Sequence, residues 1–137
     1  ICPTLIYGSN DPHNGYGPNL FLRNALDGKD IRLFGKGEEL RDHIYIEDVS
    51  TLCLKMILNN ITGRINAVTG KVTSFETIAD HCSNLVNKNI SVHYTKRNGP
   101  MPHDGYRAFD STYLKNLFPD FTPTELLKGL NNFISSV

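Results

Sequence analysis

The residues best suited to chemistry in this chain are basic side chains at the junctions of predicted strands and loops. Arg41 opens a predicted strand just after a glycine turn, and Arg97, His103 and Arg107 lie in or beside a loop rich in Pro and Gly. A guanidinium group binds a phosphate through two parallel hydrogen bonds, so arginines that converge from separate loops can hold a diphosphate. The alternative interpretation is that these arginines are solvated surface groups.

Other common catalytic motifs do not occur in the sequence. No Gly-x-Gly-x-x-Gly turn follows a strand, and there is no Walker loop, Gly-x-Ser-x-Gly elbow or Tyr-x-x-x-Lys pair. Gly35-Lys36-Gly37 is interpreted as a hairpin turn rather than a phosphate loop. None of the five histidines pairs with another at ligand spacing, so no metal site is predicted.

The three cysteines are Cys2, Cys53 and Cys82, and their spacing matches no zinc or redox motif. Cys53 and Cys82 fall on the apolar faces of predicted helices, which indicates small buried hydrophobic side chains. This cysteine usage fits a reducing, cytoplasmic environment.

Charge and hydropathy exclude two classes of partner. The chain has 14 Lys and Arg against 14 Asp and Glu, whereas a nucleic-acid-binding domain usually carries a strong basic excess. Apolar runs such as residues 52–58 are short, far below the ~20 residues that span a bilayer. We therefore expect no nucleic-acid partner and no membrane partner.

The predicted elements alternate between strands and helices, which indicates an α/β or mixed α+β fold. Strands are predicted at 1–8, 31–34, 41–46, 64–69, 90–94 and 106–109. Helices are predicted at 18–27, at 47–59, at 75–86 after a Ser74 cap, at 111–118, and after a capping box at 122–125. The chain opens directly in a strand without Met, so we expect a preceding segment in a longer parent protein.

An ordered series of motifs resembles the NAD-dependent epimerases and dehydratases, the extended short-chain dehydrogenases that act on nucleotide sugars. The most specific piece is Gly35–Val49, similar to the family's glycine turn, Arg-Asp, hydrophobic run and Asp. Weaker matches are Pro3–Gly8, Gly17–Leu20, Ile31–Gly35, Asn66, Phe109-Asp110 and Pro123–Leu130. The resemblance covers essentially all 137 residues.

The resemblance implies roles for individual residues. Arg41 would bind the substrate diphosphate, and Arg97, His103 and Arg107 would add phosphate contacts from the late loop. Asn19 and Leu20 would contact the nucleotide, Arg32 and Phe34 would lie along its base, and Asn66 would assist. Pro3 would touch the cofactor, NAD or NADP. The physical chemistry agrees, since a rigid donor fork, an apolar wall and a flexible basic loop suit a nucleotide sugar.

The chain departs from the family pattern in two ways. The family's Rossmann half is missing, with its glycine-rich turn and its Tyr-x-x-x-Lys pair, so residues 1–137 correspond to a substrate-binding C-terminal portion without a catalytic residue. Leu5 stands where well-known epimerases carry Asn, and Cys2 where they usually carry Arg. The exact sugar nucleotide and reaction therefore stay open.

Three functional hypotheses follow. The first is the nucleotide-sugar-binding part of an NAD(P)-dependent epimerase, dehydratase or reductase, and this hypothesis is compatible with a parent protein that forms a homodimer. The second is a non-catalytic remnant or interaction module that keeps the fold. The third, a relative acting on a steroid or small carbonyl compound, is disfavoured by Arg41, Arg97 and Arg107. By itself the chain is expected to turn over no substrate, and a strand at Cys2–Tyr7 unpaired on both sides would make it unstable.

Overall fold

The computed structural model describes all 137 residues, which form nine short strands, five α-helices and one 3₁₀ turn. The strands are β1 (Cys2–Pro3), β2 (Leu5–Tyr7), β3 (Ile31–Phe34), β4 (Leu40–Arg41), β5 (His43–Tyr45), β6 (Asn66–Ala67), β7 (Thr73–Ser74), β8 (Val92–Thr95) and β9 (Tyr106–Arg107). The helices are α1 (Pro18–Leu26), α2 (Ile46–Leu58), α3 (Phe75–Leu85), α4 (Thr112–Leu117) and α5 (Leu126–Ser135), with η1 at Pro102–Gly105.

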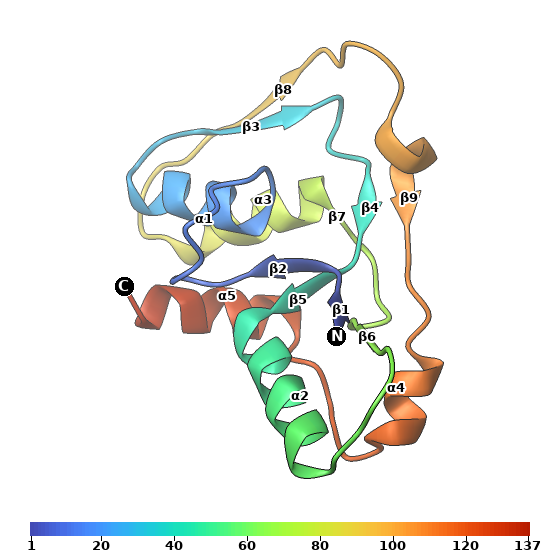
Figure 1. Cartoon of the computed structure of the whole chain (residues 1–137). Coiled ribbons are helices and arrows are strands. Elements are labelled where there is room, and N and C mark those ends of the chain that lie inside the picture. The colour runs from blue at the N-terminus through green and yellow to red at the C-terminus, as the bar shows by residue number, and fades with distance from the viewer.

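Parallel strand pairs organise the fold. The pairs β1–β6, β2–β5 and β3–β8 are each parallel, whereas β4 is the centre of a mixed sheet with β7 antiparallel on one edge and β9 parallel on the other. Parallel neighbours need long crossover connections, which the helices supply. In Figure 1, α1 and α3 lie side by side below β3 and β8. Helix α2 runs downward from the end of β5, and α4 lies at the lower right near β6. The fold is α/β, as predicted.

Two apolar clusters lie on opposite sides of the β2–β5 pair. Consecutive residues of a strand point to opposite faces, and on β5 the fully buried Ile44 belongs to one cluster and Tyr45 to the other. The larger cluster joins α1, α3, α5 and β3, with Phe21, Leu33 and Phe133 at its centre. The smaller cluster joins β5 to α2 and α4. The segment between them, β4 to β5, is thereby fixed from both sides.

Several helix signals in the sequence are confirmed. Pro18 is the first residue of α1, as predicted. The Ser74 side chain caps α3 by accepting the backbone N–H of Thr77 at 3.0 Å, and Cys82 is buried on the inner face of that helix. The longest helix has 13 residues, and none of the helices is long and apolar enough to cross a membrane.

Two predictions about α2 and its surroundings are wrong. Cys53 is exposed rather than buried, because its side of α2 faces outward together with Ile57, which is 72% exposed. The expected capping box does not form, since α5 begins only at Leu126. Thr124 instead donates its backbone N–H and hydroxyl to the Asp48 carboxylate of α2 at 2.8 and 2.9 Å.

The predicted strands differ from the observed ones in extent and pairing. The strand predicted at 41–46 is divided by Asp42 into β4 and β5, and the strand predicted at 64–69 is reduced to β6. The segment Cys2–Tyr7 is not unpaired on both sides as expected, because β1 pairs with β6 and β2 with β5. These contacts tie the start of the chain to its middle.

Candidate functional site

A pocket of about 330 Å³ lies where the start of the chain, β4 and the segment after η1 meet. It is called the arginine pocket here, and its lining residues are Pro3, Thr4, Leu5, Arg41, Pro102, His103, Arg107 and Phe109. The parallel register of β4 and β9 sets Arg41 directly beside Arg107. Three of the predicted phosphate-binding residues and the predicted cofactor contact Pro3 are thus brought together.

The guanidinium of Arg41 is buried and held on several sides. Its side chain is the central cation of the pocket, with the residue only 6% exposed. Nη1 donates to the carbonyl of Leu40 at 2.9 Å, and Nη2 donates to the carbonyl of Pro102 at 2.8 Å and to Glu39 Oε2 at 2.5 Å. A buried charge needs such partners, since an unpaired one is very costly.

Arg97, on the loop after β8, does not line the arginine pocket but contacts the same acid that holds Arg41. It forms an ion pair with the other oxygen of Glu39, so one carboxylate is shared by two guanidiniums. Its Nη2 also lies 3.5 Å from the carbonyl of Phe34. The Arg97 Nε–H is buried without an acceptor, which leaves this guanidinium with an unused donor.

Arg107 and His103 form the outer part of the pocket. Arg107 Nη1 lies 2.9 Å from His103 Nε2, and because a guanidinium only donates, that imidazole nitrogen accepts. The Arg107 guanidinium also lies 5.2 Å from the centre of the Phe109 ring. His103 and Asp104 both adopt left-handed backbone conformations, with φ of 54° and 49°, which few residues other than glycine adopt and which cluster at functional sites.

Phe34 and Tyr16 form an aromatic ledge next to the Glu39–Arg97 pair. The Phe34 ring is 51% exposed and packs on Tyr16 with 5.0 Å between ring centres. The Tyr16 hydroxyl accepts the backbone N–H of Phe34 at 3.0 Å, which fixes the two rings relative to each other. A half-exposed, rigid ring beside arginines is suited to stacking on a planar heterocycle.

The remaining predicted contacts do not line the arginine pocket. Asn19 is buried, with its Oδ1 accepting the N–H of Gly8 at 3.0 Å and its Nδ2 donating to Asp11 at 2.7 Å. Leu20 packs against the larger apolar cluster, and Arg32 is exposed on β3. Asn66 on β6 donates to the carbonyl of Asp110 at 3.4 Å. Their binding roles stay predictions.

Sequence reasoning missed Glu39, Pro102 and Phe109. Glu39 carried a usable signal, because an acid two residues before a candidate phosphate-binding arginine lies on the same face of an extended segment. Leu5, where the resembled epimerases carry Asn, also lines the pocket and offers an apolar surface that is 47% exposed.

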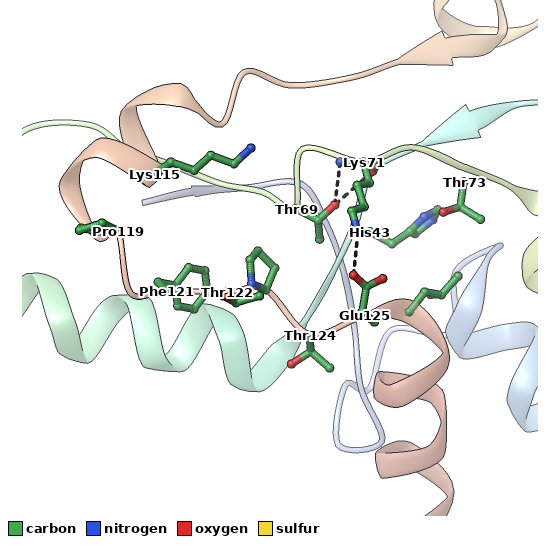
Figure 2. Close-up of a pocket in the computed structure, with 12 residues that line it drawn as sticks. His43, Thr69, Lys71, Thr73, Lys115, Pro119, Phe121, Thr122, Thr124 and Glu125 are labelled. Carbon is green, nitrogen blue, oxygen red and sulfur yellow. Dashed lines mark hydrogen bonds and ion pairs between the residues drawn. The ribbon is translucent and has the colours of Figure 1, made fainter.

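A second cavity of about 450 Å³ lies on the other side of β4 and is called the threonine cavity here (Figure 2). Its lining residues are His43, Thr69, Lys71, Thr73, Lys115, Pro119, Phe121, Thr122, Pro123, Thr124, Glu125 and Leu126. Lys71 pairs with Glu125 at 2.6 Å, and both side chains are largely exposed. The His43 ring is buried, neither ring nitrogen has a hydrogen-bond partner, and burial lowers the pKa of His43 to about 4.

A comparison of the sequence with models of protein families finds the family that the sequence motifs resemble. The family model described as "NAD dependent epimerase/dehydratase family" matches residues 1–68, a range that includes Arg41 and Glu39. The resemblance seen in the sequence is thereby confirmed.

Solved structures with the same fold come from several organisms. UDP-glucose 4-epimerase from Thermotoga maritima, solved with UDP-glucose, has a TM-score of 0.76 at 20% identity over 97% of this chain and 43% of its own. UDP-N-acetylglucosamine 4-epimerase from Methanobrevibacter ruminantium has a TM-score of 0.75 at 23% identity, over 98% and 45%. The dTDP-glucose 4,6-dehydratase from Bacillus anthracis, solved with NAD, has a TM-score of 0.73 at 22% identity, over 97% and 42%. The chain spans less than half the length of these proteins, and the likeness shows the fold.

Proposed function

We propose that the arginine pocket binds the diphosphate of a nucleotide sugar. The observation that carries the proposal is the side-by-side placement of Arg41 and Arg107 on β4 and β9, with Arg97 joined to Arg41 through Glu39. Arginine forks match the paired oxygens of phosphates, and the burial of Arg41 strengthens its attraction for an anion. The volume of about 330 Å³ suits part of such a ligand, with the rest extending along the surface.

The base of the nucleotide is assigned to the aromatic ledge. Phe34 is half exposed, rigidly supported by Tyr16, and linked to the arginines through Arg97. Structural neighbours described with UDP-glucose and with UDP-glucuronic acid support a uridine or related nucleotide. The choice among uridine, guanosine and deoxythymidine ligands is left to titration.

The chain is proposed to serve a longer NAD(P)-dependent epimerase, dehydratase or reductase as its substrate-binding portion. Neighbours with this fold were solved with NAD or NADP, which supports a nicotinamide cofactor for the parent. The 137 residues offer one predicted cofactor contact, Pro3, which lines the arginine pocket. They contain no glycine-rich turn after a strand to cradle its phosphates, so no chemical step is assigned to this chain.

Calorimetric titration of the chain with UDP-glucose, GDP-mannose and dTDP-glucose tests the proposal. At least one is expected to bind with a Kd below 1 mM, which corresponds to about −4 kcal/mol. Arg107→Met should weaken that ligand about 10- to 100-fold, because hydrogen bonds to charged groups contribute about 1.5–3 kcal/mol. Arg41→Lys, which keeps the charge but loses the fork, should weaken it about 10-fold.

The matched control is Lys115→Met, which removes an equal charge from the threonine cavity. It should change the affinity less than 2-fold at about 0.15 M salt, where distant charges are screened. Equal losses in Arg107→Met and Lys115→Met would show that only overall charge matters and would remove the pocket assignment. Absence of binding by all three ligands would favour the alternative, a non-catalytic module that keeps the fold.

A further inference from the structure

A buried carboxylate lies directly under the arginine pocket. Glu39 is 5% exposed, and its two oxygens contact two different guanidiniums, Oε2 that of Arg41 and Oε1 that of Arg97. The two arginines come from β4 and from the loop after β8, so Glu39 joins two distant parts of the chain. No other carboxylate is paired with either arginine.

An acid at this place is unfavourable for anion binding if only its charge counts. A carboxylate a few ångströms from a bound diphosphate repels it, and more strongly inside a pocket than in bulk water. A benefit must therefore come from what Glu39 does to the arginines. The guanidiniums of Arg41 and Arg97, whose side chains are 8% and 19% exposed, repel one another, and a shared carboxylate offsets that repulsion while fixing the direction of both forks.

We propose that Glu39 is a positioning residue that holds Arg41 and Arg97 as one preorganised diphosphate clamp. The inference rests on the proposed function, because the clamp is defined by its ligand. With Arg107 included, the three guanidiniums and the Glu39 carboxylate together carry two positive charges, which balance the two negative charges of a nucleotide-sugar diphosphate. Glu39 thus fixes the orientation of the two arginines and balances their charge, although its own negative charge weakens the attraction for the diphosphate.

The proposal is tested by the direction in which the ligand affinity changes when the negative charge of Glu39 is removed. Glu39→Gln removes the repulsive charge, so electrostatics alone predicts tighter binding of inorganic pyrophosphate and UDP-glucose. A Gln side chain offers one acceptor oxygen and an NH₂ group that cannot accept from the second guanidinium, so the clamp is broken. We therefore expect at least a 5-fold loss of affinity for UDP-glucose despite the added positive charge.

Two variants serve as references in that titration. Glu38→Gln removes the same charge one residue away, from an exposed side chain that accepts the backbone N–H of Lys36, and should leave the affinity unchanged or slightly higher. Glu39→Asp keeps the charge but is one methylene shorter, so it should reach only one guanidinium and give an intermediate loss. A tighter or unchanged affinity in Glu39→Gln would overturn the proposal.

A measurement without ligand separates the failure of this inference from failure of the proposed function. In the wild-type chain, NMR signals of the Arg41 and Arg97 Nε–H groups should be resolved and exchange slowly, because the Arg41 side chain and the Arg97 Nε atom are buried and Glu39 holds both guanidiniums. In Glu39→Gln, at least one should broaden or exchange rapidly, while thermal unfolding confirms that the variant is folded. Unchanged signals in the folded variant would show that Glu39 does not position the arginines, whether or not any nucleotide sugar binds.

Discussion

The two cavities on either side of β4 differ in how their charged groups are held. In the arginine pocket, Arg41 is 6% exposed and is held by a buried acid and two backbone carbonyls. In the threonine cavity, the Lys71 and Glu125 side chains are 70% and 68% exposed and have only each other. The larger volume therefore belongs to the less constrained set of charges. Burial of a charge with fixed partners, rather than volume, is the property that supports the arginine pocket as the proposed anion site.

Both cavities depend on the same short segment of chain. Arg41 faces the arginine pocket, its antiparallel partner Thr73 on β7 lines the threonine cavity, and Arg107 on β9 lies on the other edge. Asp42 and His43 follow Arg41 directly and support the threonine-cavity side. Substitutions in this segment therefore test in which cavity the side chains are firmly held and in which they are not.

The largest effect is expected from Asp42, the buried carboxylate that holds one wall of the threonine cavity. Its oxygens accept the backbone N–H of Thr69 at 3.1 Å, the Thr69 hydroxyl at 2.7 Å and the backbone N–H of Gly70 at 2.9 Å. Asp42→Ala removes three hydrogen bonds to a buried carboxylate, each of which contributes about 1.5–3 kcal/mol, so the free energy of unfolding should fall by about 4 kcal/mol.

Urea denaturation measures that loss, and Asp120→Ala provides the comparison because Asp120 is exposed and should change stability by less than about 0.5 kcal/mol. A loss below about 1 kcal/mol in Asp42→Ala would mean that the wall of the threonine cavity is held by other contacts.

The next effect is a pH dependence from His43. Burial lowers the pKa of its imidazole from 6.5 to about 4, with the charge of Arg41 acting in the same direction. The unfolded chain takes up a proton below pH 6.5 while the folded chain excludes it until about pH 4. The free energy of unfolding should therefore fall as pH drops through this window, by about 3 kcal/mol in total.

His43→Phe removes the titrating group, so subtracting its stability profile from that of the wild type isolates the histidine. The difference should be constant above pH 7 and decrease towards pH 4. If the difference in unfolding free energy did not change with pH, the His43 ring would be hydrated from the threonine cavity. The distinction between a buried ring and an open cavity would then be wrong.

Local patterns in the sequence predicted much of the fold but not its pairing. Apolar spacing predicted α2 and α3, and Pro18 and Ser74 gave the starts of α1 and α3, because these signals act within a few residues. Contacts between distant residues overrode two local signals. Thr124 bonds to Asp48 instead of capping α5, and Cys53 faces outward because helical spacing does not say how much of an apolar stripe the chain covers.

The candidate site was predicted in part for the same reason. Strand ends and a basic loop indicated Arg41, His103 and Arg107, which the structure brings together. The link between Arg97 and Glu39 joins residues from separate elements, so no local pattern reveals it. The Asn19 amide bonds to Gly8 and Asp11, an arrangement that only the folded loop creates, and its contact with the nucleotide stays a prediction.

The smallest effect is expected at the Lys71–Glu125 pair of the threonine cavity. The 2.6 Å contact is short, but the exposed side chains lose conformational freedom on pairing and their attraction is screened by water and salt. A double-mutant cycle of Lys71→Ala and Glu125→Ala should give a coupling energy of about 0.5 kcal/mol or less, and less at 1 M salt. The pair would then add little to stability. A coupling above about 1 kcal/mol would instead mean that this pair is as firmly organised as the buried Arg41–Glu39 pair, and burial would no longer distinguish the two cavities.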